Sequence, residues 1–198
     1  MPAAGRRYPP DRGSKKKGTS AVARLGFIFH IDQCIGCRAC QVACKDKNHL
    51  EVGTYFRRVD TVVEDGVYKH YSAACNQCRN AACVQACPTG AMYIARDGTV
   101  QHDDGKCIGC GSCMWACPYG SVKLSRLKGT ATKCNSCIDL REKGEKPACV
   151  QACITHCLDF GLIEENELNG DASFLPSPLK TQPALKIVRG QKGEGKDE

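Results

Sequence analysis

The residues of this chain that are able to do chemistry are its cysteines, 17 in a chain of 198 residues. Sixteen of them fall into four groups along the sequence. Group one is Cys34, Cys37, Cys40 and Cys44; group two is Cys75, Cys78, Cys83 and Cys87; group three is Cys107, Cys110, Cys113 and Cys117; group four is Cys134, Cys137, Cys149 and Cys153. Cys157 is left over.

Metal binding explains this spacing better than disulfide bonds do, because cysteines two residues apart would form strained disulfides. Structural zinc sites draw on two well-separated pairs, so group four alone resembles one, whereas groups one and three would each leave a spare cysteine. Group three, followed by Pro118, has the C-x2-C-x2-C-x3-C-P spacing of a bacterial iron–sulfur site. Group one has the same cysteine spacing with Lys45 in place of the proline. The pattern therefore predicts iron–sulfur clusters.

A cubane [4Fe–4S] cluster accounts for the spacing inside the groups. Three closely spaced cysteines wrap one cube, while the fourth, one helical turn later, points away and binds a neighbouring cluster. The loop around the cube turns backbone N–H groups toward the sulfurs, which offsets their negative charge. Sixteen such cysteines predict four [4Fe–4S] clusters, which move single electrons and require no catalytic residue from this chain.

The groups also form an internal repeat. DQCIGCRACQVACK aligns without gaps with GKCIGCGSCMWACP, and CNQC…ACVQACPTGAM aligns with CNSC…ACVQACITHCL. The order A-B-A′-B′ predicts two ferredoxin-like modules that hold two clusters each. The repeat itself leaves open which groups share a module.

Cys157 is interpreted from this alignment. It takes the place of Ala91, where the other copy needs only a small residue, and Ile154 takes the place of Pro88. Because a free cysteine behaves as a small hydrophobe, we predict that Cys157 packs and is not a ligand. A spare ligand or a redox-active thiol is the alternative.

Short strands and turns are expected between the cysteine groups. An apolar run at residues 27–31 predicts a strand that leads into group one. Residues 61–72 and 92–101 predict hairpins, and residues 121–124 predict a strand that is followed by a turn at 128–129. The predicted fold class is α+β, with two bacterial-ferredoxin-like modules of short β-hairpins and short helices around paired clusters, and with extended terminal arms.

Both ends of the chain differ in composition from its middle. Residues 1–24 are rich in Pro, Gly, Ser and Lys, which predicts a basic, flexible arm. Past Glu164 the chain becomes polar and contains several prolines, which predicts an extended arm over residues 166–198. Its Leu185, Ile187 and Val188 are candidates for contact with the surface of a partner.

The net charge of +7 does not indicate nucleic-acid binding. Residues 1–24 hold seven basic residues and one acidic residue, so they carry +6 of that charge. Four clusters with four thiolates each would bring the loaded protein to about −1. No apolar run approaches the ~20 residues of a membrane span, and Arg6-Arg7 is not followed by the apolar run of a secretory signal.

Other residues near the groups are interpreted as structural. Trp115, between Cys113 and Cys117, is predicted to pack over a cluster, with a role in conducting electrons as the alternative. Lys133 and Lys146 flank group-four cysteines and are predicted to be solvated.

The motifs together resemble a known family. CIGCRACQVACKDKN, VGTYFRRV, CPTGAM, CIGCGSCMWACPYG, KGTATKC, and GEKPACVQAC before LDFG are similar to the iron–sulfur (beta) subunit of dimethyl sulfoxide reductase, over residues 26–161. Similar subunits serve molybdopterin reductases for polysulfide, thiosulfate and related acceptors. The resemblance implies a non-catalytic electron-transfer subunit of an anaerobic respiratory reductase.

The family also implies which groups share a module. Residues 25–60 plus 129–165, with groups one and four, form the first module, and residues 61–128, with groups two and three, form the second. The implied ligand sets are Cys34, Cys37, Cys40 and Cys153 for cluster 1; Cys134, Cys137, Cys149 and Cys44 for cluster 2; Cys75, Cys78, Cys83 and Cys117 for cluster 3; and Cys107, Cys110, Cys113 and Cys87 for cluster 4. Because group three is complete, we expect four [4Fe–4S] clusters and no [3Fe–4S] cluster.

The implied partners are a molybdopterin catalytic subunit on the side of the first module, and an integral membrane anchor subunit or another redox partner, quinol-linked or otherwise, on the side of the second. The implied location is peripheral to the cytoplasmic membrane within a complex, either periplasmic by co-export or cytoplasmic. Two other functions stay open: a standalone polyferredoxin that serves several soluble oxidoreductases, and a zinc-ribbon protein that binds nucleic acid.

Overall fold

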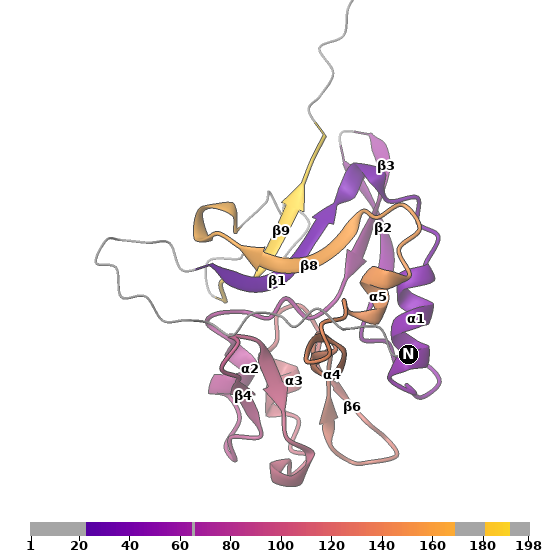
Figure 1. Ribbon diagram of the computed structural model, residues 1–198. Helices are drawn as coiled ribbons and strands as arrows, with labels where there is room; N and C mark the ends of the chain where they lie inside the picture. Colours follow the sequence, from indigo (N-terminus) through magenta and orange to yellow (C-terminus); the bar gives the residue numbers. More distant parts are fainter. Residues whose placement is uncertain (1–22, 65, 169–180, 191–198) are drawn as a thin grey trace, which may run out of the picture.

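Short strands and short helices form two groups of elements, one built from both ends of the described chain and the other from its middle (Figure 1). The computed structural model describes residues 23–64, 66–168 and 181–190. The predicted arm at residues 1–24 lies almost entirely outside them, as do residues 169–180 and 191–198. This mixture of small elements is the α+β fold class that the sequence predicts.

A three-stranded sheet in the order β8-β1-β9 supports the first group of elements. Strand β1 spans Arg24–His30, β8 spans Leu158–Ile163 and runs antiparallel to β1, and β9 spans Leu185–Val188 and runs parallel to β1. Phe27 on β1 pairs with Phe160 on one side and with Leu185 on the other. The rings of Phe27 and Phe160 meet edge to face with centroids 4.9 Å apart, which fixes the packing of β8 on β1.

The described residues also form three antiparallel pairs of strands. They are β2 (Arg58–Glu64) with β3 (Val67–Ala73), β4 (Met92–Ile94) with β5 (Val100–His102), and β6 (Lys123–Leu124) with β7 (Ala131–Thr132). The predicted strand at 27–31 and the predicted hairpins at 61–72 and 92–101 are confirmed. The predicted strand at 121–124 is shorter than expected, since only its last two residues pair with β7.

Each cysteine group is followed or interrupted by a short helix. The α-helices are α1 (Ala39–Lys47), α2 (Ala82–Gln85), α3 (Ser112–Ala116), α4 (Ile138–Arg141) and α5 (Ala148–Gln151), and three 3-10 turns span Ile31–Gln33, Asp104–Lys106 and Glu165–Glu167. The repeat is visible here, because the two ACVQ segments form the equivalent helices α2 and α5. Helices α1 and α3 both begin after a residue in the left-handed region, Arg38 and Gly111 respectively.

The elements enclose two apolar cores, and each core contains cysteines. The first core includes Phe29, Tyr71, Leu158, Cys40, Cys44, Cys149 and Cys153. The second includes Met92, Val100, Val122, Cys83 and Cys113, with Cys78, Cys87, Cys107 and Cys117 packed against it. Two residues near the expected module boundaries pack in the opposite core from the one expected. Tyr71, expected in the second module, lies in the first core, and Ala131, expected in the first module, lies in the second core.

The described part of the C-terminal segment does not extend toward a partner. Strand β9 adds to the edge of β1, and Leu185 and Ile187 are each only 6 % exposed within the first core. The expectation that Leu185 and Ile187 contact the surface of a partner is therefore wrong. Beyond β9, the Gly190 N–H donates to Asp32 Oδ2 at 2.7 Å, which fastens this end of the strand close to group one.

Candidate metal centres

All four C-x2-C loops turn in the same way. The residue before the second cysteine of each loop has a positive φ: Gly36 at 70°, Gln77 at 47°, Gly109 at 69° and Ser136 at 54°. This left-handed turn wraps the loop and is costly for residues with a side chain. At Gly36 and Gly109 glycine is also required by space, because an added Cβ would lie 2.7 Å from the His70 ring and 2.3 Å from the Gly129 carbonyl oxygen, respectively.

Groups two and three share a cavity. Among its lining residues are three cysteines of group two and the last cysteine of group three: Cys75, Cys78, Cys83 and Cys117. Burial raises the pKa of the Cys78 and Cys83 thiols to about 12, and charges on their cysteine neighbours in this set add to the effect. We refer to these four residues as the third quartet.

The remaining cysteine of group two lies with the first three of group three. A charge on Cys87 acts on the thiols of Cys110 and Cys113, and a charge on Cys107 acts on Cys113. We refer to Cys87, Cys107, Cys110 and Cys113 as the fourth quartet. Cys110 is exposed, so this quartet reaches the surface.

Groups one and four are brought together in the same interleaved way. A second cavity is lined by Cys34, Cys37 and Cys40 of group one and by Cys153 of group four. We refer to these four residues as the first quartet. Cys37 is exposed, so this quartet also reaches the surface.

The second quartet consists of Cys44 and the first three cysteines of group four, Cys134, Cys137 and Cys149. Burial raises the pKa of Cys44 to about 12, and charges on Cys149 and Cys137 contribute to the rise. Burial also raises the pKa of Cys134, with contributions from the charges of Cys44, Cys75 and Cys149. Both Cys44 and Cys134 are buried.

The quartets follow one another through specific pairs of cysteines. Cys40 of the first quartet interacts electrostatically with Cys149 of the second, Cys134 of the second with Cys75 of the third, and Cys83 of the third with Cys113 of the fourth. The sulfurs of adjacent quartets therefore lie within electrostatic range of one another. The four quartets therefore follow one another in the order of their numbers. The first and the fourth quartet each contain an exposed cysteine, Cys37 and Cys110 respectively.

Polar hydrogens point at several of the sulfurs. Backbone N–H groups donate to Cys87 Sγ from Met92 at 3.5 Å, to Cys107 Sγ from Ala131 at 3.4 Å, and to Cys134 Sγ from Ser136 at 3.3 Å. Ser136 lies in the loop between Cys134 and Cys137, whereas Met92 and Ala131 lie on β4 and β7. The expectation that the loops turn N–H groups toward sulfur is therefore met at Cys134. Such donors stabilise the negative charge of metal-bound thiolates.

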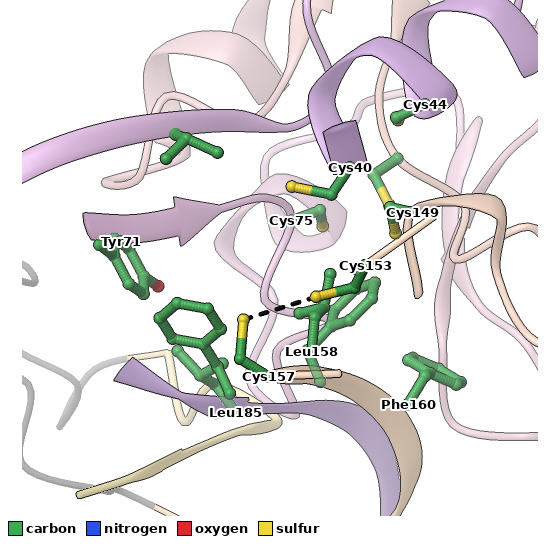
Figure 2. Close-up of a cluster of buried hydrophobic side chains, with 14 of the residues drawn as sticks. Cys40, Cys44, Tyr71, Cys75, Cys149, Cys153, Cys157, Leu158, Phe160 and Leu185 are labelled. Carbon is green, nitrogen blue, oxygen red and sulfur yellow. Dashed lines mark hydrogen bonds between the residues drawn. The ribbon is translucent and has the colours of Figure 1, made fainter. Parts of the chain in front are cut away.

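A fifth thiol, that of Cys157, also lines the cavity of the first quartet, and Cys157 is 3 % exposed. Its Sγ lies 3.5 Å from Cys153 Sγ, and Figure 2 shows the two sulfurs directed toward each other. Hydrogen bonding to Cys34 and burial raise the pKa of Cys157, while the same hydrogen bond lowers the pKa of Cys34 to about 7. Cys157 is thus a packed thiol, as the alignment predicts, but it touches two cysteines of the first quartet.

Two of the structural interpretations are wrong. Trp115 is 84 % exposed and does not pack over the fourth quartet, because its position on α3 faces outward. Lys133 is 5 % exposed rather than solvated, and its Nζ donates to the carbonyl oxygens of Val100 and Cys134. Lys146 is solvated as expected, with a side chain 53 % exposed and an ion pair to Asp159 at 2.6 Å.

The donor set of each quartet consists of thiols, which iron–sulfur clusters require as thiolates. Among the described residues, no three His, Cys, Asp or Glu side chains are close enough to share a single metal ion. A cubane places each of its four thiolates on a different iron, so its ligands need not converge on one point. The cavities and the thiol donors fit such a group, and the raised thiol pKa values mean that iron binding must displace protons from the sulfurs.

Sequence reasoning gave no role to Arg57, which lies in the VGTYFRRV motif. It is 2 % exposed, and its pKa is affected by Cys149, Cys134, Cys40 and Cys44, which belong to the first and second quartets. One signal in the sequence could have indicated a buried arginine. A basic pair follows an aromatic residue at the start of a strand whose residues alternate in burial.

The sites and the fold define the class of protein: an iron–sulfur protein of the 4Fe-4S dicluster type. The 4Fe-4S dicluster domain family is matched twice, by residues 67–163 and by residues 33–91. The chain relays electrons and is a non-catalytic electron-transfer subunit.

Comparison with individual proteins gives the particular family. The chain is 40 % identical over 182 residues to the B subunit of the anaerobic dimethyl sulfoxide reductase of Escherichia coli (strain K12), covering 84 % of this chain and 89 % of the relative. It is 42 % identical over 145 residues to the thiosulfate reductase electron transfer subunit PhsB of Salmonella typhi, covering 69 % and 74 %. It is 34 % identical over 184 residues to the B subunit of the polysulfide reductase of Wolinella succinogenes, covering 86 % and 96 %. The chain belongs to this family of reductase iron–sulfur subunits.

Proposed function

We propose that the four quartets hold four [4Fe–4S] clusters, numbered like the quartets, and that the chain relays single electrons along them. The observation that carries the proposal is the interleaving of the groups. The fourth cysteine of each group lies with three cysteines of another group, in the pairs one with four and two with three. This arrangement supports two ferredoxin-like modules, with one boundary between groups one and two and the other between groups three and four.

The relay begins and ends at the surface. At the first quartet, Ile35 and Val42 are 60 % and 65 % exposed, and at the fourth quartet, Ile108 and Trp115 are 67 % and 84 % exposed. The two pairs occupy equivalent positions of the repeat, CIGCRACQV and CIGCGSCMW. Exposed apolar side chains beside each terminal cluster are suited to contact with another protein.

The partners we propose follow from the family. A molybdopterin catalytic subunit docks beside the first quartet, and a quinol-linked membrane anchor subunit docks beside the fourth. The chain is then a peripheral subunit of a membrane complex that reduces dimethyl sulfoxide, polysulfide, thiosulfate or a related acceptor. None of the helices in the described residues is long and apolar enough to cross a membrane.

The first experiment is anaerobic purification from the native source by a tag on this chain, followed by iron and acid-labile sulfide analysis. We expect about sixteen of each per chain, together with a copurifying protein that contains molybdopterin. A full cluster content in a soluble monomer that reduces several soluble acceptors would contradict the subunit role and favour the polyferredoxin. About twelve iron and twelve sulfide per chain would contradict the four-cluster proposal instead.

A further inference from the structure

Arg57 is a buried arginine at the junction of the first and second quartets. It directly precedes β2 and is 2 % exposed. Its Nη1 donates to the backbone oxygen and to the Oγ of Ser72, both at 2.9 Å, and its guanidinium carbon lies 4.4 Å from the ring centroid of Phe27. Its Nε and Nη2 are buried and have no hydrogen-bond partner among the described residues.

This guanidinium lacks the partner that a buried charge requires. No carboxylate within the described ranges forms an ion pair with Arg57. A buried charge without a counter-charge is strongly unfavourable, and so is a buried N–H group without an acceptor. Two buried donor nitrogens without partners among the described residues therefore indicate an anionic acceptor that this part of the polypeptide does not supply.

The charges around Arg57 come from cysteines. Burial alone would lower the pKa of Arg57, but charges on Cys149, Cys134, Cys40 and Cys44 outweigh burial and raise it. Cys40 belongs to the first quartet, whereas the other three belong to the second. The guanidinium is therefore within electrostatic reach of both sites of the first module.

A hydrogen-bond chain also links Arg57 to one thiol. Ser72 Oγ lies 3.3 Å from Cys40 Sγ and 2.9 Å from Arg57 Nη1. A guanidinium can only donate, so Ser72 Oγ accepts from Arg57 and its own hydrogen is free for the Cys40 sulfur. A hydroxyl held in this way is a hydrogen-bond donor to a cluster ligand, and it is polarised by a positive charge.

We propose that Arg57 is the shared counter-charge of clusters 1 and 2: it acts on the Cys40 ligand through Ser72, and its Nε and Nη2 donate to sulfur atoms of the clusters. The inference rests on the ligand sets proposed above. It makes Arg57 a positioning residue that sets the reduction potentials of the first module, since hydrogen bonds to sulfur and nearby charge are what tune such potentials. A positive charge favours the more negative, reduced cluster.

The test is redox titration of the loaded protein, followed by electron paramagnetic resonance. Cys37→Ser and Cys137→Ser first assign the signals of clusters 1 and 2. In Arg57→Gln, we expect the reduction equilibrium constants of both clusters to fall at least tenfold, which is a downward shift of about 59 mV for one electron. Clusters 3 and 4 should change by less than twofold.

Two further variants separate charge from hydrogen bonding. Arg57→Lys keeps the charge and should stay within threefold of the unsubstituted protein at both clusters. Ser72→Ala keeps the charge but removes the donor to Cys40, so it should lower the potential of cluster 1 and leave cluster 2 unchanged. The matched control is Arg58→Gln, since the neighbouring Arg58 side chain is 54 % exposed and pairs with Asp60 at 2.7 Å. It should shift no cluster.

Each outcome decides a separate point. A full iron count with unshifted potentials in Arg57→Gln, or an equal shift of all four clusters, overturns the role of Arg57 and leaves the ligand sets intact. A low iron count in the unsubstituted protein overturns the ligand sets. If Arg57→Gln does not load, Ser72→Ala decides: a shift confined to cluster 1 supports the chain from Arg57 to Cys40, and no shift overturns it.

Discussion

The Sγ atoms of Cys153 and Cys157 lie 3.5 Å apart (Figure 2), and both residues line the cavity of the first quartet. The contact is local: His156 has a positive φ of 53°, and its N–H donates to the Cys153 carbonyl oxygen at 3.1 Å, so the chain turns back on itself. Because of this turn, Cys157 also forms a hydrogen bond with Cys34, another cysteine of the first quartet. One packed thiol contacts two proposed ligands of the same cluster.

Replacing Cys157 by alanine should leave all four clusters in place. The thiol stays protonated beside Cys34, and the aligned position in the other repeat is Ala91. We expect about sixteen iron per chain and a loss of about 1 kcal/mol of stability, because only a small buried group is removed. Iron analysis and thermal unfolding check these expectations.

The control is Cys153→Ala, four residues earlier in the same segment. It removes a proposed ligand, so about twelve to fifteen iron per chain and an altered cluster 1 signal are expected. An iron loss in Cys157→Ala as large as that in Cys153→Ala would mean that Cys157 is a ligand.

The interleaved ligand sets predict that distance along the chain does not decide which cluster is lost. Cys83→Ala and Cys117→Ala, 34 positions apart, should abolish the same electron paramagnetic resonance signal, because both residues line one cavity. Cys113→Ala, only four positions from Cys117, should abolish a different one. Redox titration of the three variants checks this, and equal spectra for Cys113→Ala and Cys117→Ala would refute the pairing.

The sequence was sufficient for the cysteine pattern, the α+β class and the hairpins, because those depend on spacing, turns and alternation along the chain. It was not sufficient for features that depend on contacts between distant segments. Lys133 reads as a solvated residue until its Nζ is seen to bond the Val100 carbonyl oxygen. Strand β9 reads as a polar arm because its partner β1 lies more than 150 residues earlier. Trp115 reads as a core residue by type, yet it lies on the outer face of a very short helix.

Strand β9 should contribute to the stability of the first module. Ile187 pairs with Phe29 and is 6 % exposed in the first core, so Ile187→Ala should cost about 2 to 4 kcal/mol. On the same strand, Lys186 is partly exposed and pairs with Glu167 at 2.5 Å, so Lys186→Ala should cost at most about 1 kcal/mol. Thermal unfolding of the loaded proteins, followed by cluster absorbance, measures the difference. Equal effects of the two variants would argue against a structural role for β9.

The ion pair between Asp97 and Arg141 should hold the two groups of elements together. Arg141 Nη1 lies 2.8 Å from Asp97 Oδ2 in the β4–β5 turn, while its guanidinium carbon lies 5.2 Å from the Phe160 ring centroid on β8. Burial opposes ionisation of Asp97, but hydrogen bonds from Thr99 and Arg141 keep its pKa below the ordinary value of 3.8. Its contribution to stability is therefore complete above that ordinary value and is lost only as the pH falls through the lower, folded-state pKa.

Asp97→Asn should lower the melting temperature by an amount that is the same at pH 8 and pH 5, because Asp97 is ionised in both folded and unfolded chains at both values. We expect a loss of about 1 kcal/mol, since the pair is partly solvated. Asp60→Asn is the matched control, because Asp60 forms an exposed pair with Arg58, and it should have little effect. If the difference in melting temperature between Asp97→Asn and the unsubstituted protein changed between pH 8 and pH 5, a group other than Asp97 would have to titrate with this contact.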